Sequence, residues 1–341
     1  KSPIGSMKST ASAHRSVGYD VLKALQDRGE TSSFLQARLD YAEAALLLHQ
    51  HIEPLVGRRR VYPNMCLPQA SGRVGISDPP IGNFTADPGY GPHGLRDVVR
   101  PDTTTRWICA DWSSVEGWIV SHRCQDPVDL EAKQRGLDLH TVTAIRMFRY
   151  PDPPADPTKE WLKSNPGQAW RAQVGFTESI RGGVKNTRYT MQYAKQATTV
   201  ARYAVKLGLP PKQLIEFGHR YLKAKPWLVK WKEQRWAEAW RRKEARTAFG
   251  RRRRLLGDRY QVEKEGLNHE VQGTVADMMK TTMVALAEIG CHMALQRHDG
   301  WCSSVDITWD DMASYKAIVE RTWEIDGRSI SFPSEYETIE A

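Results

Sequence analysis

The sequence is short of cysteine and has no long apolar run. Its 341 residues include five cysteines, with no CxxC pair and no histidine at the spacing of a zinc site, which excludes the common zinc motifs. Cysteines scattered in this way predict free thiols in a reducing compartment. No segment approaches the ~18 consecutive apolar residues needed to cross a membrane, and no apolar leader segment is evident. We therefore expect a soluble, cytoplasmic protein with no membrane partner.

Basic side chains are in excess, and they are clustered. Lysine and arginine total 49 against 40 aspartates and glutamates, which gives a formal net charge of +9. The clusters are Arg58–Arg60, Arg251–Arg254 and the segment from Lys223 to Arg246. Such clusters suit the phosphate backbone of a nucleic acid, although a solvated basic face explains many runs of this kind.

Apolar periodicity predicts a largely helical chain with a few short strands. We expect helices over 34–55, over most of 176–248, and over 268–290 and 311–324. Short strands and turns are expected over 62–92, a strand that turns helical after Asp111 over 107–119, a proline-rich loop over 151–166, and strands beside the HDG turn and over 329–332. Four tryptophans in the basic segment are predicted to pack in the core: Trp227, Trp231, Trp236 and Trp240.

The segment RGGVKNTRYTMQYAK, residues 181–195, spaces two cations and two phenols four residues apart. The four are Arg181, Lys185, Tyr189 and Tyr193. At about 100° per residue, a step of four advances a side chain by only about 40°, so the four share one face if the segment is helical. Arg188 and Gln192 fall in the same sector. Cations at one end and rings at the other suit a nucleoside triphosphate, whereas an amphipathic surface helix with its tyrosines on the core explains the same spacing.

Two aspartates, Asp111 and Asp299, each lie at the end of a strand-like run. Carboxylates are the ligands that magnesium prefers. On adjacent strands, two such groups could hold two Mg²⁺ ions that activate a hydroxyl and stabilise a departing pyrophosphate. Taken singly, each is more typical of a turn or a helix cap, so the case depends on their order around the 181–195 segment.

The order of the motifs resembles that of family A DNA polymerases, the DNA polymerase I type. The matching motifs are Asp111-Trp-Ser-Ser-Val-Glu116, Asp138-Leu-His140, Arg181-x3-Lys185-x3-Tyr189-x3-Tyr193, Asn268-x3-Gln272-Gly273 and His298-Asp299. SGR at Ser71–Arg73 and TAFGRRRR from Thr247 are similar to further stretches of the family. Each motif alone is common, but their shared order along residues 21–332 is specific.

The resemblance implies an α+β protein with the right-hand polymerase fold. It predicts a truncated thumb over 1–57, the first part of an antiparallel β-sheet palm with motif A over 58–116, helical fingers with motif B over 117–250, and the second part of the palm with motif C over 251–341. The implied activity is template-directed extension of a primer 3′ end with deoxynucleoside triphosphates by two-metal phosphoryl transfer, with no proofreading exonuclease in this chain.

The resemblance also implies a role for each matching residue. The ligands of two Mg²⁺ ions, for which Mn²⁺ would substitute, would be Asp111, Asp299 and the carbonyl of Trp112. The triphosphate would be bound by Arg181, Lys185 and His140, with Lys185 also catalytic. The base would meet Tyr189 and Tyr193, and the sugar 2′ position would meet Glu116, which excludes ribonucleotides. The minor groove of the DNA would be contacted by Arg73, Asn268 and Gln272, and the primer terminus by His298.

The expected partners are primer–template DNA, deoxynucleoside triphosphates and a separate exonuclease or processivity factor, with the chain itself a monomer. Gly300 departs from the family, which usually has Glu after the motif C aspartate, so a lower rate is expected. Ser114, Gly117 and Ala194 are further departures. A relative of single-subunit RNA polymerases is one alternative, against which Glu116 argues. A catalytically weak or silent nucleic-acid-binding module is the other, and the retained aspartates argue against it.

Overall fold

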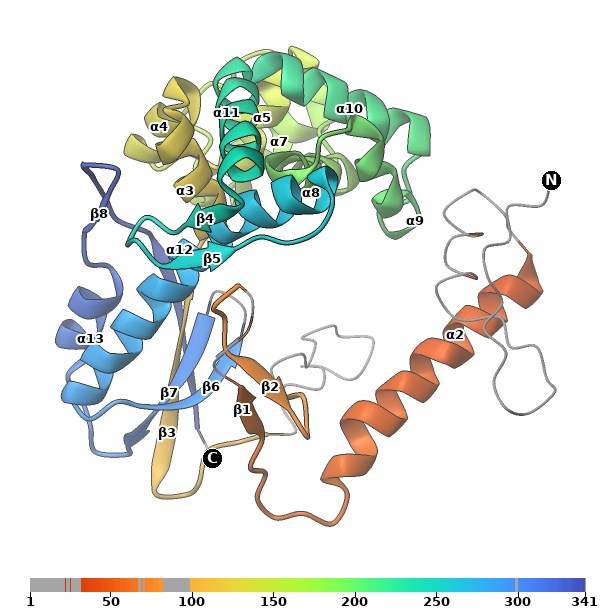
Figure 1. Ribbon diagram of the computed structural model, residues 1–341. Helices are drawn as coiled ribbons and strands as arrows, with labels where there is room; N and C mark the ends of the chain where they lie inside the picture. The colour runs from red at the N-terminus through yellow and green to blue at the C-terminus, as the bar shows by residue number, and fades with distance from the viewer. Residues whose placement is uncertain are drawn as a thin grey trace.

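The protein has a four-stranded sheet with a large group of helices at one end of it (Figure 1). The computed structural model describes residues 22, 25, 32–66, 69, 71–81, 99–297 and 300–340. In Figure 1, α12 and α13 lie beside the sheet, while α2 extends away from it on the other side. Helices and an antiparallel sheet in separate parts of the chain make this an α+β fold, as predicted.

The sheet is antiparallel throughout and has the strand order β10-β3-β7-β6. Its strands are β3 (Thr105–Trp112), β6 (His292–Arg297), β7 (Gly300–Asp306) and β10 (Ser334–Ile339). Alternate residues of β3 point to opposite faces. Ile108, Ala110 and Trp112 therefore join the main core, whereas Trp107 and Cys109 join a smaller core on the other face.

Helices make up most of the remaining described chain. They are α2 (Ser33–Leu47), α3 (Val115–Cys124), α4 (Pro127–Gln134), α5 (Leu139–Phe148), α6 (Lys159–Lys163), α7 (Asn165–Val174), α8 (Glu178–Tyr193), α9 (Ala204–Leu207), α10 (Pro211–Ala224), α11 (Pro226–Arg242), α12 (Arg259–Glu288) and α13 (Met312–Val319). Shorter turns of helix are η1 (Leu48–Ile52), η2 (Glu53–Leu55) and η6 (Ala197–Tyr203). Within the described ranges, none of these helices combines the length and apolarity needed to span a membrane.

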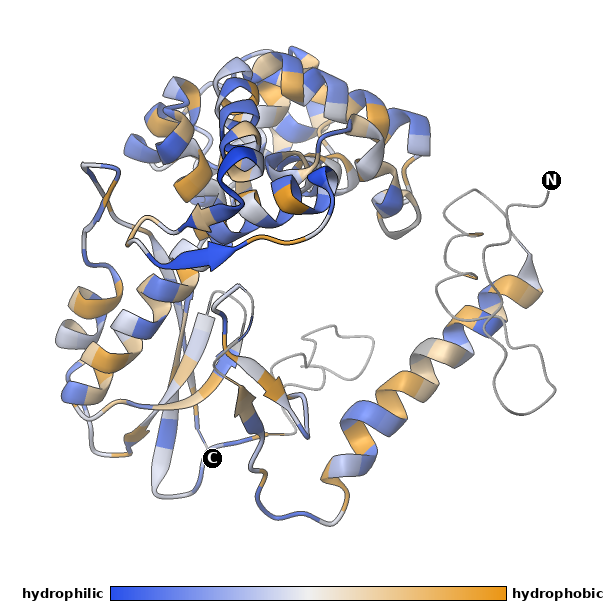
Figure 2. Ribbon diagram, in the orientation of Figure 1, coloured by the Kyte–Doolittle hydropathy of each residue, from blue (hydrophilic) through white to orange (hydrophobic). Residues whose placement is uncertain are grey.

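Three two-stranded hairpins complete the fold. They pair β1 (Asn64–Cys66) with β2 (Gly75–Ser77), β4 (Glu244–Arg246) with β5 (Arg252–Arg254), and β8 (Trp323–Ile325) with β9 (Arg328–Ile330). Strand β5, which carries three arginines of the Arg251–Arg254 cluster, is strongly hydrophilic (Figure 2).

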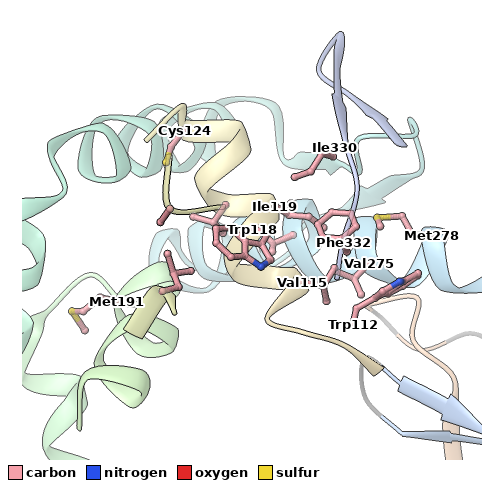
Figure 3. Packing of buried hydrophobic residues seen from close by; sticks show 14 of the residues in the cluster. Trp112, Val115, Trp118, Ile119, Cys124, Met191, Val275, Met278, Ile330 and Phe332 are labelled. Atoms are coloured by element: carbon pink, nitrogen blue, oxygen red, sulfur yellow. The ribbon is translucent and has the colours of Figure 1, made fainter. Parts of the chain in front are cut away.

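The main core joins the sheet to the helical group. Trp112 at the end of β3 contacts Trp301 of β7 edge to face, with ring centroids 5.0 Å apart, and Figure 3 shows Trp112 near Val115, Val275 and Phe332. The same continuous cluster extends through α3 to α8 and α10. The end of β3 is thus held rigidly between the two parts of the molecule.

Two of the cysteines are not free, so the prediction of five free thiols is wrong. Cys109 of β3 and Cys302 of β7 form a disulfide across the sheet. They are direct partners in the antiparallel register, a proximity that only the fold creates because 193 positions separate them. Cys66, Cys124 and Cys291 are free thiols.

Most predicted elements are present, with several differences. The β4–β5 hairpin was not predicted, and β4 replaces the end of an expected helix. The helix expected over 311–324 ends at Val319, and β8 begins at Trp323. The proline-rich segment 151–166 contains α6 and the start of α7 rather than being a loop throughout. Strand β10 was not predicted, because its exposed edge position leaves a polar sequence. Trp231 is buried and Trp236 and Trp240 are partly buried, but Trp227 is exposed, so the core prediction is wrong for that residue.

Candidate active site

A cavity of about 790 Å³ lies where the sheet meets the helical group. Its walls come from the end of β3, the α4–α5 region, α8 and the start of β10. Asp111 lines it from the sheet, and Arg181, Lys185 and Tyr189 line it from α8. Residues from the predicted motifs A and B therefore meet in one cavity.

The chain reverses sharply after β3. Ser114 has a left-handed backbone (φ 57°, ψ 33°) and α3 begins at the next residue. Trp112 is 2 % exposed, and its indole nitrogen donates to the carbonyl oxygen of Val319 at 3.0 Å. A left-handed conformation is costly for a residue with a Cβ and is concentrated at functional sites. The buried tryptophan thus anchors the turn while its neighbours, Asp111 and Ser113, face the cavity.

Helix α8 presents the four predicted side chains on one accessible face. It begins after Thr177, whose hydroxyl accepts from the Ile180 N–H at 3.2 Å, and it ends at Tyr193. Three of the four line the cavity and the fourth, Tyr193, contacts Glu116. Arg188 and Gln192 share this sector of the helix, as the spacing predicts, but both are buried with 2 % exposure and neither lines the cavity.

The core side of α8 holds a buried ionic cluster. Arg188 pairs with Asp129 of α4 at 3.0 Å, and Lys225 pairs with Asp129 at 2.5 Å and with Asp126 at 2.9 Å. Burial by itself would raise the pKa of Asp129, but the two cations outweigh it and lower that pKa. Arg188 also donates to the hydroxyl of Thr143 at 2.6 Å. These contacts tie α8 to the helices behind it.

A lysine of α11 holds the last turn of α8. The ammonium of Lys232 donates to the carbonyl oxygens of Met191 and Ala194, each at 2.6 Å. These carbonyls belong to the helix end, where the backbone lacks intrahelical donors and the dipole favours a cation. Burial lowers the pKa of Lys232 to about 7. Sequence periodicity gave no signal for this contact.

The cationic end of α8 is held by an aspartate. Arg181 donates to Asp138 at 2.8 Å, while the other carboxylate oxygen of Asp138 accepts from the Thr141 N–H and hydroxyl at 2.8 and 2.7 Å. Burial by itself would raise the pKa of Asp138, but Arg181 and His140 outweigh it and lower that pKa. The guanidinium therefore reaches the cavity in a fixed position.

His140 lies between α8 and the cavity wall. Burial lowers its pKa to about 3, and nearby cations contribute to this shift, so the imidazole is neutral near pH 7. Its ring is 6.2 Å from that of Tyr189, and its Nδ1 has no hydrogen-bond partner within the described chain. A buried nitrogen without a partner is available to a ligand in the cavity.

Glu116 is the meeting point of three predicted motifs. Tyr193 donates its phenol hydrogen to one carboxylate oxygen, and Arg73 pairs with the other. Arg73 is brought there by Arg251, which donates to the carbonyl oxygen of Ser71 at 3.0 Å. Gly72 permits this approach, because a Cβ there would lie 2.3 Å from the Arg251 guanidinium.

Gly300, the departure from the family pattern, lies directly opposite Asp111 in the register of β3 and β7. A Cβ at position 300 would lie 2.8 Å from the carbonyl oxygen of Ala110 and 3.1 Å from the Cβ of Asp111. The absence of a side chain therefore leaves room for the Asp111 carboxylate in this backbone arrangement.

The remaining predicted residues lie elsewhere or outside the description. Asn268 and Gln272 are half-buried on α12, one turn apart, and do not line the cavity. His298 and Asp299 lie outside the described residues, so their predicted roles stay predictions. Sequence reasoning missed Lys159, Ser113 and Glu335, which line the cavity and contact one another. Ser113 lies within the first motif but was given no role, and no motif marks Lys159 or Glu335.

The residues present are compatible with metal binding. The Asp111 side chain faces the cavity beside a glycine, and a carboxylate is the donor that Mg²⁺ prefers. No group of three or more His, Cys, Asp or Glu side chains with metal-binding geometry occurs among residues 99–297 and 300–340 or the shorter described ranges. Any metal centre at Asp111 would therefore need a donor from Asp299, the substrate or the backbone.

Comparison with known proteins identifies relatives over most of the chain. A family model described as DNA polymerase family A matches residues 2–160 and 169–333. The thermostable DNA polymerase I of Thermus thermophilus is 27% identical over 310 residues, which are 86% of this chain and 34% of that protein. DNA polymerase I of Pseudomonas aeruginosa is 27% identical over 265 residues, 74% of this chain and 26% of that protein.

A solved structure has a similar fold. The polymerase domain of Pol1 from M. smegmatis, in complex with DNA primer–template and dNTP, superposes with a TM-score of 0.72 and 21% sequence identity. The superposition covers 97% of this chain and 57% of that one. The chain spans between about a quarter and a third of the length of the curated relatives above.

Proposed function

From the premise that the chain belongs to DNA polymerase family A, we propose that it extends the 3′ end of a DNA primer with deoxynucleoside triphosphates on a template strand. The observation that supports this most is the single cavity that unites Asp111 with the cations and phenol of α8. We assign the sheet to the palm, the helices from α3 to α11 to the fingers, and residues 1–57 to the thumb.

The nucleotide would lie along α8, with its triphosphate at Arg181 and Lys185 and its base toward Tyr189 and Tyr193. Phosphoryl transfer depends mainly on positioning and charge neutralisation. Arg181 is pre-positioned by Asp138, while Lys185 is exposed in the cavity. The unpaired nitrogen of neutral His140 would meet a phosphate oxygen as a hydrogen-bond donor.

The sugar would lie against Glu116, whose carboxylate is fixed by Arg73 and Tyr193. A carboxylate held in this way leaves no room for a 2′-hydroxyl, which supports discrimination against ribonucleotides. We assign Arg73, Asn268 and Gln272 to the DNA minor groove and His298 to the primer terminus.

Asp111 and Asp299, with the carbonyl of Trp112, would hold two Mg²⁺ ions, which supply activation of the primer hydroxyl and charge neutralisation at the leaving pyrophosphate. The protein's own contribution is rigidity, since the buried Trp112 side chain fixes the turn that carries Asp111.

Primer extension tests the proposal. The wild-type chain should extend a primer with deoxynucleotides in the presence of Mg²⁺ and not in the presence of a chelator. Asp111→Ala should abolish extension and leave primer–template binding, measured on the same preparation, intact. Asp310→Ala, at an exposed position outside the cavity lining, is a control for loss of a carboxylate. Extension by Asp111→Ala at a substantial fraction of the wild-type rate would contradict the assignment, and a wild type that binds DNA without extending it would indicate the silent module.

A further inference from the structure

A second cationic wall of the cavity, outside α8, carries Lys133 and Lys159. Lys159 is the first residue of α6 and lines the cavity together with Asp111 and Ser113. The family match stops at residue 160 and resumes at 169, so Lys159 lies at the edge of a segment that the family model does not match.

The short helix that carries Lys159 is firmly anchored. The hydroxyl of Thr158 caps it by accepting from the Trp161 N–H at 3.1 Å. Leu162 is buried in the main core, and the Trp161 ring lies 6.0 Å from that of Trp170. The backbone of Lys159 is therefore fixed, while its long side chain reaches across the cavity toward the sheet.

The ammonium of Lys159 is held beside the strand that carries Asp111. It donates to Glu335 at 2.7 Å and to the hydroxyl of Ser113 at 3.3 Å, and Ser113 donates to the same carboxylate at 3.0 Å. Glu335 is the direct partner of Asp111 in the register of β10 and β3. The ammonium of Lys159 thus contacts Ser113, which is two residues from Asp111 in the sequence. A triphosphate bound along α8 would approach the sheet at this place.

The pairing of Lys159 with Glu335 is exchangeable. Their side chains are 49% and 69% exposed, and ion pairs this exposed contribute little to stability. The other lysine on this wall, Lys133, already donates to the carbonyl oxygen of Ser331. A triphosphate offers several anionic oxygens with strong acceptor character, which suits an ammonium in a partly desolvated cavity.

We propose that Lys159 is a nucleotide-binding residue that leaves Glu335 for the β- and γ-phosphates of the incoming nucleotide and retains the pyrophosphate product. This inference rests on the proposed polymerase function. Glu335 acts as the resting partner of the ammonium and competes with the ligand for it. The two residues therefore have opposite effects on affinity for polyphosphate.

The test measures equilibrium binding of the complementary deoxynucleotide to the protein with a primer–template whose primer ends in a dideoxynucleotide, so that no chemistry occurs. Inhibition of primer extension by inorganic pyrophosphate is measured in parallel. Lys159→Met should weaken deoxynucleotide binding and pyrophosphate inhibition by about tenfold each, because it removes one charge-assisted hydrogen bond. Lys159→Arg should recover most of the loss. Lys212→Met, an exposed lysine on α10 outside the cavity lining, should match the wild type.

Glu335→Gln decides between ligand binding and a merely structural bridge. If Glu335 competes with phosphate, this variant should bind pyrophosphate severalfold more tightly than the wild type. The inference would be overturned if Lys159→Met and Glu335→Gln weakened binding equally, or if Lys159→Met bound as Lys212→Met does. In either case, primer extension by the wild type would still support the proposed function. Absence of wild-type extension would instead count against the function itself.

Discussion

Arg181 and Arg188 lie seven residues apart on α8 and meet different surroundings. Arg181 lines the cavity and pairs with one carboxylate, that of Asp138. The rest of its side chain is accessible from the cavity. Arg188 is buried and is surrounded by Asp129, the hydroxyl of Thr143 and the ring of Tyr221. Seven residues make about two turns, so both side chains leave α8 on nearly the same side. The arginine in the first turn keeps its charge available to a ligand, and the arginine two turns further on has its charge neutralised within the protein. The same side-chain type therefore serves binding at one position and anchoring at the other.

The largest expected effect of this difference is on folding. Arg188→Met leaves Asp129 with Lys225 alone in a buried site, and breaking a buried ion pair by removing one partner typically costs about 3–5 kcal/mol. That cost is a large share of the stability of an ordinary domain. Chemical denaturation should show it directly. A matched substitution at the cavity, Lys185→Met, should leave the free energy of unfolding within about 0.5 kcal/mol; equal losses in the two variants would mean that the buried and the cavity-lining positions do not differ.

On activity the order of the two variants reverses. Lys185→Met removes an exposed cavity cation, so we expect kcat/KM for deoxynucleotides to fall about 10²–10³-fold, as for loss of one preorganised charge-stabilising group. DNA binding should be unchanged. Steady-state extension at varied nucleotide concentration, with a DNA titration of the same preparation, provides the measurement. A loss confined to DNA affinity would place Lys185 on the template or primer instead of the nucleotide.

The accessible face of α8 was predictable from sequence because four-residue spacing translates directly into a shared helix face. The burial of Arg188 was not, since the same periodicity puts it near that face and only the packing of α4 behind the helix supplies Asp129. Motif order marked Glu116, Tyr193 and Arg73 as site residues, but their contacts with one another were not predicted. Lys159 and Glu335 carry no motif, and the disulfide of Cys109 depends on sheet register, so these features required the fold.

Lys232 acts on the same helix, because it holds the C-terminal turn of α8 through two carbonyl oxygens. Its pKa is lowered to about 7 by burial, whereas in the unfolded chain it keeps the ordinary value near 10.5. Between these values the unfolded state binds the additional proton, so the contribution of Lys232 makes stability rise with pH from about 7 to 10.5. The slope approaches about 1.4 kcal/mol per pH unit.

Replacing this lysine should remove that slope. We expect the stability of the wild type relative to Lys232→Met to increase as pH rises from 7 to 9, measured by chemical denaturation at several pH values. Lys230→Met, an exposed lysine on the same helix, should show no such trend. A constant difference between the wild type and Lys232→Met across this range would mean that Lys232 has an ordinary pKa and stays charged at the helix end.

The smallest change, one hydroxyl on the cavity face, has the most selective expected effect. The phenol of Tyr189 donates to the hydroxyl of Ser114 at 3.4 Å, a long contact, and so points toward the turn after Asp111. A dideoxynucleotide lacks its 3′-hydroxyl and leaves a polar vacancy beside its triphosphate, which a phenol oxygen can fill and a phenyl ring cannot. We therefore expect the wild type to incorporate dideoxynucleotides well and Tyr189→Phe to discriminate against them strongly, with little change in normal extension or in unfolding. The ratio of dideoxy- to deoxynucleotide incorporation in the two proteins measures this. Ser114→Ala is the matched control, because it removes the hydroxyl that Tyr189 contacts while leaving the phenol in the cavity. If Tyr189→Phe keeps the wild-type ratio, the phenol does not reach the sugar, and the nucleotide lies along α8 in another orientation than the one proposed.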